Sequence, residues 1–430
     1  MCALGTDFKQ LGLDDLKRIA YRSARLQHNW SRELIRPVWS TTLTLPEAWS
    51  QKEIVAAISG TPRIILLATT PDGDVLALCL VDDEPEQRII HATMGSVIHH
   101  ASYDDKGKCL IGLIFQRRVG PPNQRDICIF SITHGHGQNL NIHWQKIYQS
   151  TIVDHFVYTD SAFILENVFG YRYIKGDGKA YIRAINYVKN THIDFHEHNA
   201  DFSRGVSVLR HSKCFKSDVS ATHLVTVCHS GDSDARNTYR FPIGTLFDSV
   251  ANGMIYNSPQ IEQVDATHFI SEPTMMGCPP GHRADVHVYH EYPSPLGLHL
   301  VTAGWYCVPG GVEELFDSFT VVQFSPYKNS VGADMTDEVR IARVELPCFY
   351  RNIDFSASGT YALLAGEGDN VSDFLLLEFR LDPPRIETRQ VALPFILSTL
   401  CTVIDERSGV IYFDNVISGA RCTLQAVRFA

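Results

Sequence analysis

The 430-residue sequence lacks every short motif that marks the common catalytic folds. It has no HExxH zinc-protease motif, no GxSxG nucleophile elbow, no glycine-rich phosphate-binding loop and no protein-kinase signature. Enzymes built on repeat folds can assemble a site from scattered residues, so these absences lower the expectation of catalysis without removing it. We therefore expect no cofactor and assign no catalytic residue.

Long apolar segments and basic patches are also missing. No window approaches the ~18 uninterrupted apolar residues of a membrane-spanning helix, and the N-terminus has no apolar stretch of the kind found in secretory signals. The formal net charge is −10, whereas a nucleic-acid-binding domain is expected to be basic. We expect no membrane span, no nucleic-acid partner and a location in the cytoplasm or nucleus.

The eleven cysteines form no pattern that suggests disulfides or a metal site. Their number is odd, none is part of a CxxC motif, and most lie inside apolar runs such as Leu78-Cys79-Leu80. A cysteine in such a run behaves as a small buried hydrophobic residue. This usage is typical of a reducing compartment.

Short apolar runs separated by turn residues make up most of the chain. Hydrophobic residues account for 44% of the sequence, enough for a large core. The run from Arg63 to Thr69, for example, leads through Pro71-Asp72-Gly73-Asp74 into a second run from Val75 to Val81. Runs rich in valine, isoleucine, leucine and aromatic residues, bounded by such turns, predict β-strands.

Three of these units share one plan, in which a small or acidic residue is followed by a turn glycine and an apolar strand. Two of the glycines, Gly359 and Gly409, are fifty residues apart, which suits a four-stranded blade with generous loops. The fold class predicted is all-β, a β-propeller of six or seven blades, with a pair of β-sandwiches as the alternative. The three units begin at Ala101, Asp354 and Val403.

The N-terminal region differs from the rest. Apolar residues between Leu13 and Leu26 recur at spacings of three and four, so a short helical segment is predicted, with domains at 1–36 (helical segment) and 37–430 (propeller). A second helix, or else a loop, is predicted for 46–59. The alternating run from Trp39 to Leu45 is a strand candidate that would complete the blade ending at 424–429.

A histidine-rich segment is the densest candidate for chemistry. His192, Asp194, His196 and His198 are two residues apart, so in a strand they would share a face and offer nitrogen and oxygen ligands for zinc or iron. The alternative is a polar edge strand or loop, since the chain contains 19 histidines and chance clusters are expected. No metal is assigned, and His192, His196 and His198 stay the weaker alternative.

Candidate partner-binding residues are arginines and a tryptophan, the usual anchors of protein interfaces. Arg117 and Arg118 open a proline-containing loop, and Trp305 lies in a Gly-Trp-Tyr segment where burial in the core of its blade is equally expected. Arg283 belongs to a segment of alternating polar and apolar residues, 283–291, typical of a half-buried strand.

The segment Ser23-Ala24-Arg25-Leu26-Gln27-His28-Asn29-Trp30, with Arg36-Pro37 after it, resembles the region that follows the F-box in F-box proteins of mushroom-forming fungi. The resemblance implies a helix followed by a degenerate β-propeller-like region, and a role in substrate recognition by a cullin-type ubiquitin ligase. The F-box itself is not found in the ten residues before Leu11. A ligase adaptor is therefore expected as a partner only if an F-box is supplied upstream. Leu26 and Trp30 would pack the helix on the propeller.

The function expected from these observations is a non-catalytic protein-interaction scaffold, in which one face of the propeller binds a protein partner. Two alternatives stay open. One is a propeller hydrolase or lyase that uses the histidine segment in its channel. The other is a cytosolic carbohydrate-binding propeller.

Overall fold

The structure is a computed structural model of the whole chain. The residues it describes are 17, 24, 28, 30, 34–58, 61–81, 89–93, 95–104, 108–117, 124–134, 142–153, 156–165, 167–174, 180–196, 213–216, 222–229, 236–242, 255–256, 262–265, 282–293, 298–309, 316–326, 342–346, 350–356, 360–366, 374–381, 383–393, 402–406, 408–415 and 423–429. From β15 to β22 only the backbone is described.

The described strands form seven sheets. We number the sheets in chain order, naming the innermost strand first: β3–β6, β7–β10, β11–β14 with β18, β15–β17 with β19, β20–β23, β24–β27 with β1, and β28–β30 with β2. The strand bounds are β1 (Leu34–Ile35), β2 (Trp39–Thr44), β3 (Ser50–Ile58), β4 (Arg63–Thr70), β5 (Gly73–Leu80), β6 (Ile89–Thr93), β7 (Ser96–Asp104), β8 (Leu110–Arg117), β9 (Arg125–His134), β10 (Ile142–Ile152), β11 (Phe156–Leu165), β12 (Val168–Ile174), β13 (Ala180–Asn186), β14 (Thr191–His196), β15 (Lys213–Lys216), β16 (Thr222–His229), β17 (Arg236–Pro242), β18 (Ile255–Tyr256), β19 (Glu262–Asp265), β20 (His282–Pro293), β21 (Leu298–Pro309), β22 (Phe316–Pro326), β23 (Ala342–Leu346), β24 (Tyr350–Phe355), β25 (Tyr361–Gly366), β26 (Phe374–Leu381), β27 (Pro384–Val391), β28 (Thr402–Asp405), β29 (Val410–Asn415) and β30 (Thr423–Arg428).

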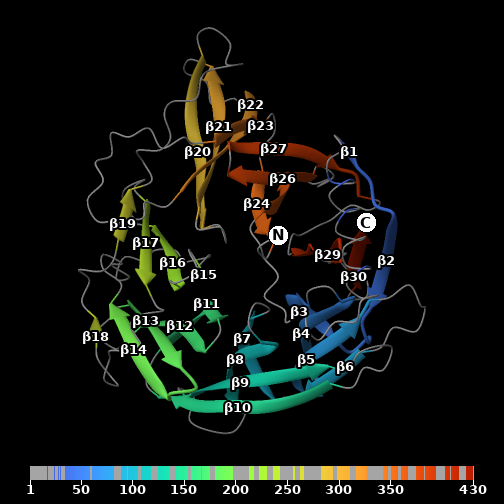
Figure 1. Cartoon of the computed structure of the whole chain (residues 1–430), viewed down its shortest axis with the longest axis vertical. Helices are drawn as coiled ribbons and strands as arrows, with labels where there is room; N and C mark the ends of the chain where they lie inside the picture. Colours follow the sequence, from blue (N-terminus) through green and yellow to red (C-terminus); the bar gives the residue numbers. More distant parts are fainter. Residues whose placement is uncertain are drawn as a thin grey trace.

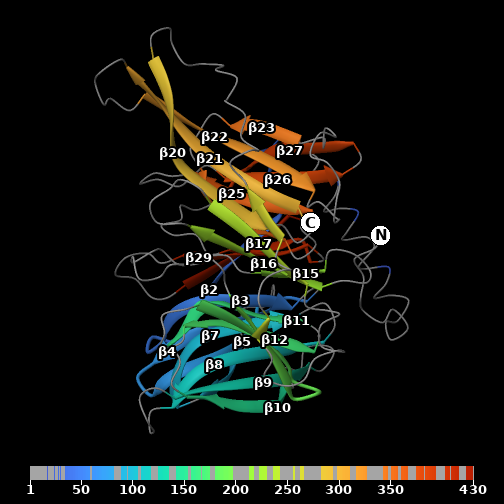
Figure 2. The ribbon, with the colours of Figure 1, turned by 90° about the vertical axis from the view of Figure 1, so that its left-hand side faces the viewer.

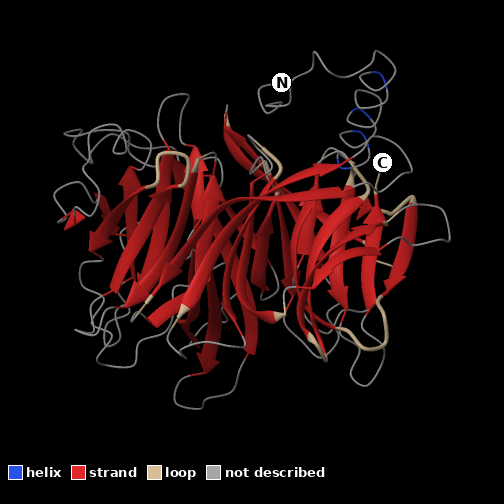
Figure 3. Ribbon diagram, turned by 90° about the horizontal axis from the view of Figure 1, so that it is seen from below, coloured by secondary structure: helices blue, strands red, loops and turns tan. Residues whose placement is uncertain are grey.

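The sheets follow one another around a ring in the order of the sequence (Figure 1). Innermost strands of neighbouring sheets lie against each other, as β3 does against both β7 and β28. Seen from the side, the twisted sheets lie next to one another, each inclined relative to its neighbours (Figures 2 and 3). Antiparallel sheets of four strands repeated radially are a β-propeller, so the predicted all-β propeller fold is confirmed at that level.

The ring closes by joining the two ends of the chain. Strand β2 pairs antiparallel with β30, from Trp39 opposite Arg428 to Thr44 opposite Thr423, and becomes the outermost strand of the seventh sheet. This is the closure predicted from the alternating pattern of residues 39–45. The last sheet is thus held by both ends of the chain, which protects the ring from opening at that point.

Two sheets carry a fifth strand, which pairs in parallel with their fourth strand. Strand β1 pairs with β27 through Leu34 and Ile35, and β18 pairs with β14 through Ile255 and Tyr256. These additions extend the sixth and third sheets at the periphery of the ring (Figure 1).

Tight hairpins lie where the sequence predicts them. Gly73 ends the turn between β4 and β5 with a φ of 128°, and Gly409 lies in the turn between β28 and β29 with a φ of 67°. Both angles are in the region that only glycine adopts readily, which explains a glycine at each turn. Ser408 supports the second turn by donating a hydrogen bond to the carboxylate of Asp405.

The core consists of apolar side chains packed between neighbouring sheets. Strands β4 and β5 are buried along almost their whole length, because each has a sheet on both faces. Between the second and third sheets, the ring of Phe169 covers Gly112 so closely that a Cβ at residue 112 would lie 2.3 Å from Phe169 Cε2. Glycine is required there by the approach of the two sheets.

The helix or loop predicted for 46–59 is wrong over most of its length, since residues 50–58 form β3. Two β-bulges, between Gln51 and Glu53 and between Ile54 and Ala56, interrupt the alternation of the strand. As a result Ile54, Ala57 and Ile58 are buried at a spacing that imitates a helix.

The predicted N-terminal helix falls mostly outside the described residues. Lys17, Ala24, His28 and Trp30 are described, and each has helical backbone geometry. Leu26 is outside the description, and the domain boundary between residues 36 and 37 stays a prediction. Within the described part of the chain, no helix has the length and apolar character needed to cross a membrane.

Candidate interaction site at the N-terminal joint

Trp30 anchors the N-terminal segment to the ring. Its side chain is 1% exposed and belongs to the core cluster shared by the sixth and seventh sheets. The indole ring meets Tyr361 edge-on, with 4.6 Å between ring centroids, and Phe429 at 6.4 Å. The role predicted for Trp30, packing the segment on the propeller, is confirmed by these contacts.

The two strands that follow Trp30 continue this attachment. Strand β1 lies on the sixth sheet and β2 on the seventh, and Ile35 is buried in the same cluster as Trp30. The backbone N–H of Ala392 also donates a hydrogen bond to the carbonyl of Ile35, with 2.9 Å between N and O. We call Trp30, β1 and β2 the N-terminal joint.

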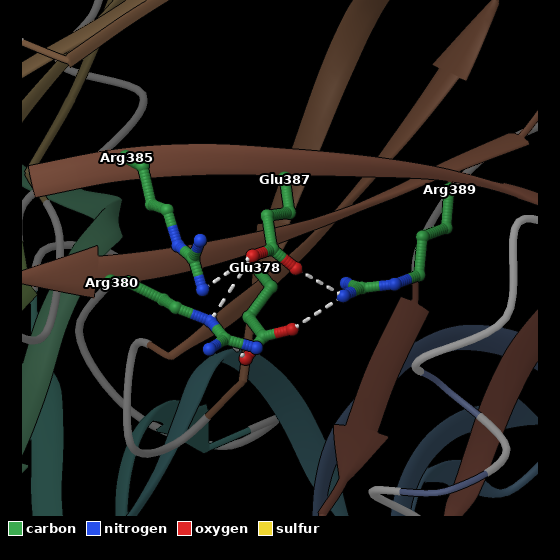
Figure 4. Close-up of polar contacts among 5 residues, drawn as sticks. All are labelled: Glu378, Arg380, Arg385, Glu387 and Arg389. Carbon is green, nitrogen blue, oxygen red and sulfur yellow. Dashed lines mark hydrogen bonds and ion pairs between the residues drawn. The ribbon is translucent and has the colours of Figure 1, made fainter.

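A network of five charged side chains lies on one face of strands β26 and β27 (Figure 4). Arg389 Nη2 is 2.9 Å from Glu378 Oε2 and also bonds Glu387. Arg380 and Arg385 reach the same glutamates, at 3.1 Å from Glu378 and 2.9 Å from Glu387. The strands hold the network because Glu378 lies directly opposite Glu387, and Arg380 opposite Arg385.

The network borders the N-terminal joint, because Tyr361, the ring that Trp30 contacts, lies directly opposite Glu378 in the sheet. Burial raises the pKa of Tyr361 to about 12, and the carboxylates of Glu378 and Glu406 add to the effect while Arg389 and Arg380 oppose it. Arg389 is only 7% exposed, and its ion pairs with the two glutamates compensate for the burial of its charge. The joint therefore combines an apolar anchor with a charged border.

The described members of the predicted partner-binding set lie in two sheets, Arg117 in the second and Arg283 and Trp305 in the fifth. Arg117 ends β8, is exposed, and forms an ion pair with Asp126 at 2.8 Å, while Arg118 lies outside the described residues. Arg283 is on β20, opposite Val308. Trp305 is on β21, the second strand of the fifth sheet, paired with Val286 and Phe319.

The histidine segment lies on β14, the fourth strand of the third sheet, between β13 and β18. His192, Asp194 and His196 occupy alternate positions of β14, opposite Ile185, Arg183 and Tyr181. Only the first two side chains are described, and His198 lies outside the described residues. Among the described side chains, no group of three or more histidine, cysteine, aspartate or glutamate residues is placed to hold a metal.

The carboxylate of Asp194 pairs with an arginine of the neighbouring strand. It accepts two hydrogen bonds from Arg183, from Nε at 2.6 Å and from Nη2 at 2.7 Å. Burial is the largest single influence on the pKa of Arg183 and lowers it, but the hydrogen bonds to Asp194, together with the charge interactions with Tyr171, Asp194 and Tyr173, raise the pKa of the guanidinium overall. Burial and the positive charge of Arg183 lower the pKa of His192, which favours a neutral imidazole.

Aromatic rings surround the ion pair of Arg183 and Asp194. The guanidinium of Arg183 lies 5.0 Å from the ring centroid of Tyr173, which stacks on Tyr181 with 5.5 Å between centroids. Burial raises the pKa of both Tyr171 and Tyr173, so neither phenol is prepared to act as a base near neutral pH. The cluster has the features of a structural ion pair enclosed by aromatic residues.

The charged network and its position beside Trp30 were not predicted from the sequence. One signal was present, because Glu378 and Arg380, and likewise Arg385, Glu387 and Arg389, alternate along their strands and therefore share a face. The sequence does not state that these two segments pair with each other in this register.

No protein-family model matches the sequence, and no curated protein matches it. Among solved structures, an oligogalacturonate lyase from Vibrio parahaemolyticus is similar over 90% of this chain and 96% of its own, with a TM-score of 0.50 and 10% identity. An oligogalacturonate lyase in complex with manganese covers 90% and 97%, at 9% identity and a TM-score of 0.48. The β-propeller domain of the Trilobed protease from Pyrococcus furiosus covers 89% and 94%, at 9% identity and a TM-score of 0.43. At such identities the likeness shows the fold alone.

Proposed function

We propose that the chain is a non-catalytic protein-interaction scaffold, a propeller of seven blades with one sheet in each blade. Its N-terminal joint holds whatever precedes it in a fixed position relative to the ring. In the form that the resemblance to F-box proteins implies, the ring recognises a substrate protein and the segment before the joint connects to a ubiquitin ligase.

The observation that carries the proposal is the attachment of Trp30. The side chain of Trp30 is buried between Tyr361 and Phe429, and the two strands that follow it pair with two different sheets, so Trp30 and these strands are tied to both the sixth and the seventh sheet. Such an attachment suits a scaffold that must hold two partners, one bound to the ring and one bound to the segment before the joint, at a fixed distance and orientation.

The rival hypothesis, a propeller enzyme with a histidine-based or metal site, has less support. Asp194, the carboxylate at the centre of the histidine segment, is engaged by Arg183, and the described part of the segment lies on β14, the fourth strand from the ring's centre. No observation singles out the carbohydrate-binding alternative.

The test is affinity capture with the full chain from cell extract, followed by reconstitution with the captured protein in purified form. A saturable complex of defined stoichiometry supports the scaffold. Joining an F-box module ahead of residue 1 should then bring the ligase adaptor and the captured protein into one complex. A stoichiometric transition metal in the purified chain, with turnover of a small substrate and no protein complex, would contradict the proposal.

A further inference from the structure

Strand β10 is the longest outermost strand of the described sheets. It runs for 11 residues, from Ile142 to Ile152, whereas β2 has 6 residues, β6 and β23 have 5 each, β19 has 4, and β1 and β18 have 2 each. One edge pairs with β9, and nothing in the described part of the chain pairs with the other. Figure 1 shows β10 at the periphery of the ring. Its outer row of backbone amides and carbonyls therefore faces away from the second sheet.

The side chains of β10 do little to protect this edge. Natural edge strands are usually blocked by prolines, by several charges or by a very short length. Residues 142–153 contain no proline and no acidic residue, and Lys146 is the single lysine or arginine. Ile147 and Val153 are 40% and 47% exposed, so two apolar side chains flank the run from Tyr148 to Ile152.

The same chain shows how such an edge is extended. Strand β1 on β27 and strand β18 on β14 each add a fifth strand, parallel to the fourth strand of a sheet. Each uses only two residue pairs. The run Tyr148–Ile152 offers five consecutive residues in regular register with β9, more than either of these additions needs.

We propose that β10 binds an extended acidic segment of a partner protein as a parallel fifth strand of the second sheet. This inference rests on the proposed scaffold function and names the surface and the chemistry of its partner. Main-chain hydrogen bonds to the outer edge supply affinity, and side chains at alternate positions supply selectivity. The acidic character follows from charge complementarity, because Lys146 has no carboxylate beside it anywhere on β10.

The β-bulge at Ile147 fixes where the segment binds. The register with β9 shifts between Lys146 and Tyr148, which turns the strand at that point and exposes Ile147. A partner strand on Tyr148–Ile152 therefore has Ile147 at one end and Val153 at the other, about 20 Å apart. Apolar residues of the partner would contact these two side chains.

The probe for a first experiment is a fluorescent synthetic peptide of about nine residues that alternates glutamate and valine. Fluorescence anisotropy with the full chain should show saturable binding. Hydrogen exchange should slow at least about fivefold in residues 142–152 and stay unchanged in the outermost strands β6 and β23. The same peptide with alternate backbone nitrogens methylated should bind at least about tenfold more weakly, because it cannot complete the main-chain hydrogen bonds.

A charge reversal tests the assignment of Lys146. Lys146→Glu should weaken the glutamate–valine peptide at least about fivefold and strengthen binding of a lysine–valine peptide. Lys189→Glu, the same change at an exposed hairpin of the third sheet, is the matched control and should leave both affinities unchanged. Lys146 is exposed and donates only to Gln149 among the described contacts, so the variant is expected to fold.

Three results would overturn the proposal. The first is equal binding of the methylated and unmethylated peptides, and the second is slowed hydrogen exchange outside β10. The third is slowed exchange in β10 that increases with protein concentration together with dimer formation, which would make a second copy of the chain the occupant. Capture of protein partners by the Lys146→Glu variant separates the two proposals. Undiminished capture would remove β10 from the account and leave the scaffold function standing. Loss of capture in Lys146→Glu but not in Lys189→Glu would support both.

Discussion

Replacing Gly112 by alanine tests how closely the second and third sheets approach each other. The added Cβ would lie 2.3 Å from Cε2 and 2.4 Å from Cδ2 of Phe169, whereas ordinary contacts are 3.4–4 Å. Relief therefore needs a displacement of more than about 1 Å by a ring that is 0% exposed and enclosed on all sides. Overpacking of this kind costs about 1–3 kcal/mol of folding free energy. About 0.5–1 kcal/mol of this is offset, because alanine loses less backbone conformational entropy than glycine when the strand forms.

We therefore expect Gly112→Ala to lower the free energy of unfolding by about 1 kcal/mol, the middle of the range that the two effects leave. Urea denaturation followed by tryptophan fluorescence measures it, with the first transition compared if there is more than one. The companion variant Phe169→Leu should be destabilising alone, but the double variant should lose at least about 1 kcal/mol less than the sum of the two. Unchanged stability in Gly112→Ala, or strict additivity in the double variant, would refute the close approach.

Three further predictions concern buried polar groups. Asp194→Ala should lower stability by roughly 3 kcal/mol, because it leaves the guanidinium of Arg183 partly buried without its partner; urea denaturation measures this, and an unchanged midpoint would contradict the pairing. Burial raises the pKa of the Cys79 thiol to about 12, so a thiol reagent at neutral pH should modify Cys79 only after unfolding, and mass mapping of modified peptides would reveal an error. Burial lowers the pKa of His100 to about 4, against a backbone hydrogen bond with Ala162 that raises it. As the pH falls, the His100 imidazole is protonated in the unfolded chain before it is protonated in the folded protein. The stability contributed by neutral His100 is therefore fully present above about pH 6.5, and it falls toward pH 4 by at most about 1.4 kcal/mol per pH unit. Since part of His100 reaches solvent, this slope is an upper limit. If the free energy of unfolding of a His100→Gln variant falls as steeply below about pH 6.5 as that of the wild type, His100 is not the cause of the pH dependence.

The features predicted correctly depend on local sequence. The Pro-Asp-Gly turn before β5 and the glycine at 409 predicted hairpins because only those residues suit the backbone there. The pairing of β2 with β30 was also predicted, since an alternating strand at one end of a propeller needs a partner at the other end.

The features that were missed depend on pairings between segments distant in the sequence. Two bulges in β3 give its buried residues a helix-like spacing, and a bulge depends on the neighbouring strand rather than on the residues themselves. The two-residue strands β1 and β18 are too short to leave any pattern. Likewise, the network around Arg389 exists only because β26 and β27 pair in one register.

The histidine segment shows the limit of arguments from residue type. The alternation of His192, Asp194 and His196 correctly predicts a shared face of a strand. It contains no information on Arg183, whose position opposite Asp194 converts a possible metal ligand into half of an ion pair. The deciding residue lies on the preceding strand, and the register of that hairpin decides the chemistry.

The most direct test of the account measures how firmly the N-terminal joint holds the segment before it. Spin labels would be placed at the exposed residues Lys17 and Val188 through non-natural amino acids, because the chain has eleven cysteines. Pulsed electron resonance then gives the distribution of distances between them. We predict a narrow distribution in the wild type, a broad one in Trp30→Ala, and a narrow one in the matched control Val38→Ala, whose side chain is 54% exposed. A broad distribution in the wild type, or a narrow one that survives Trp30→Ala, would contradict the joint and with it the proposed scaffold.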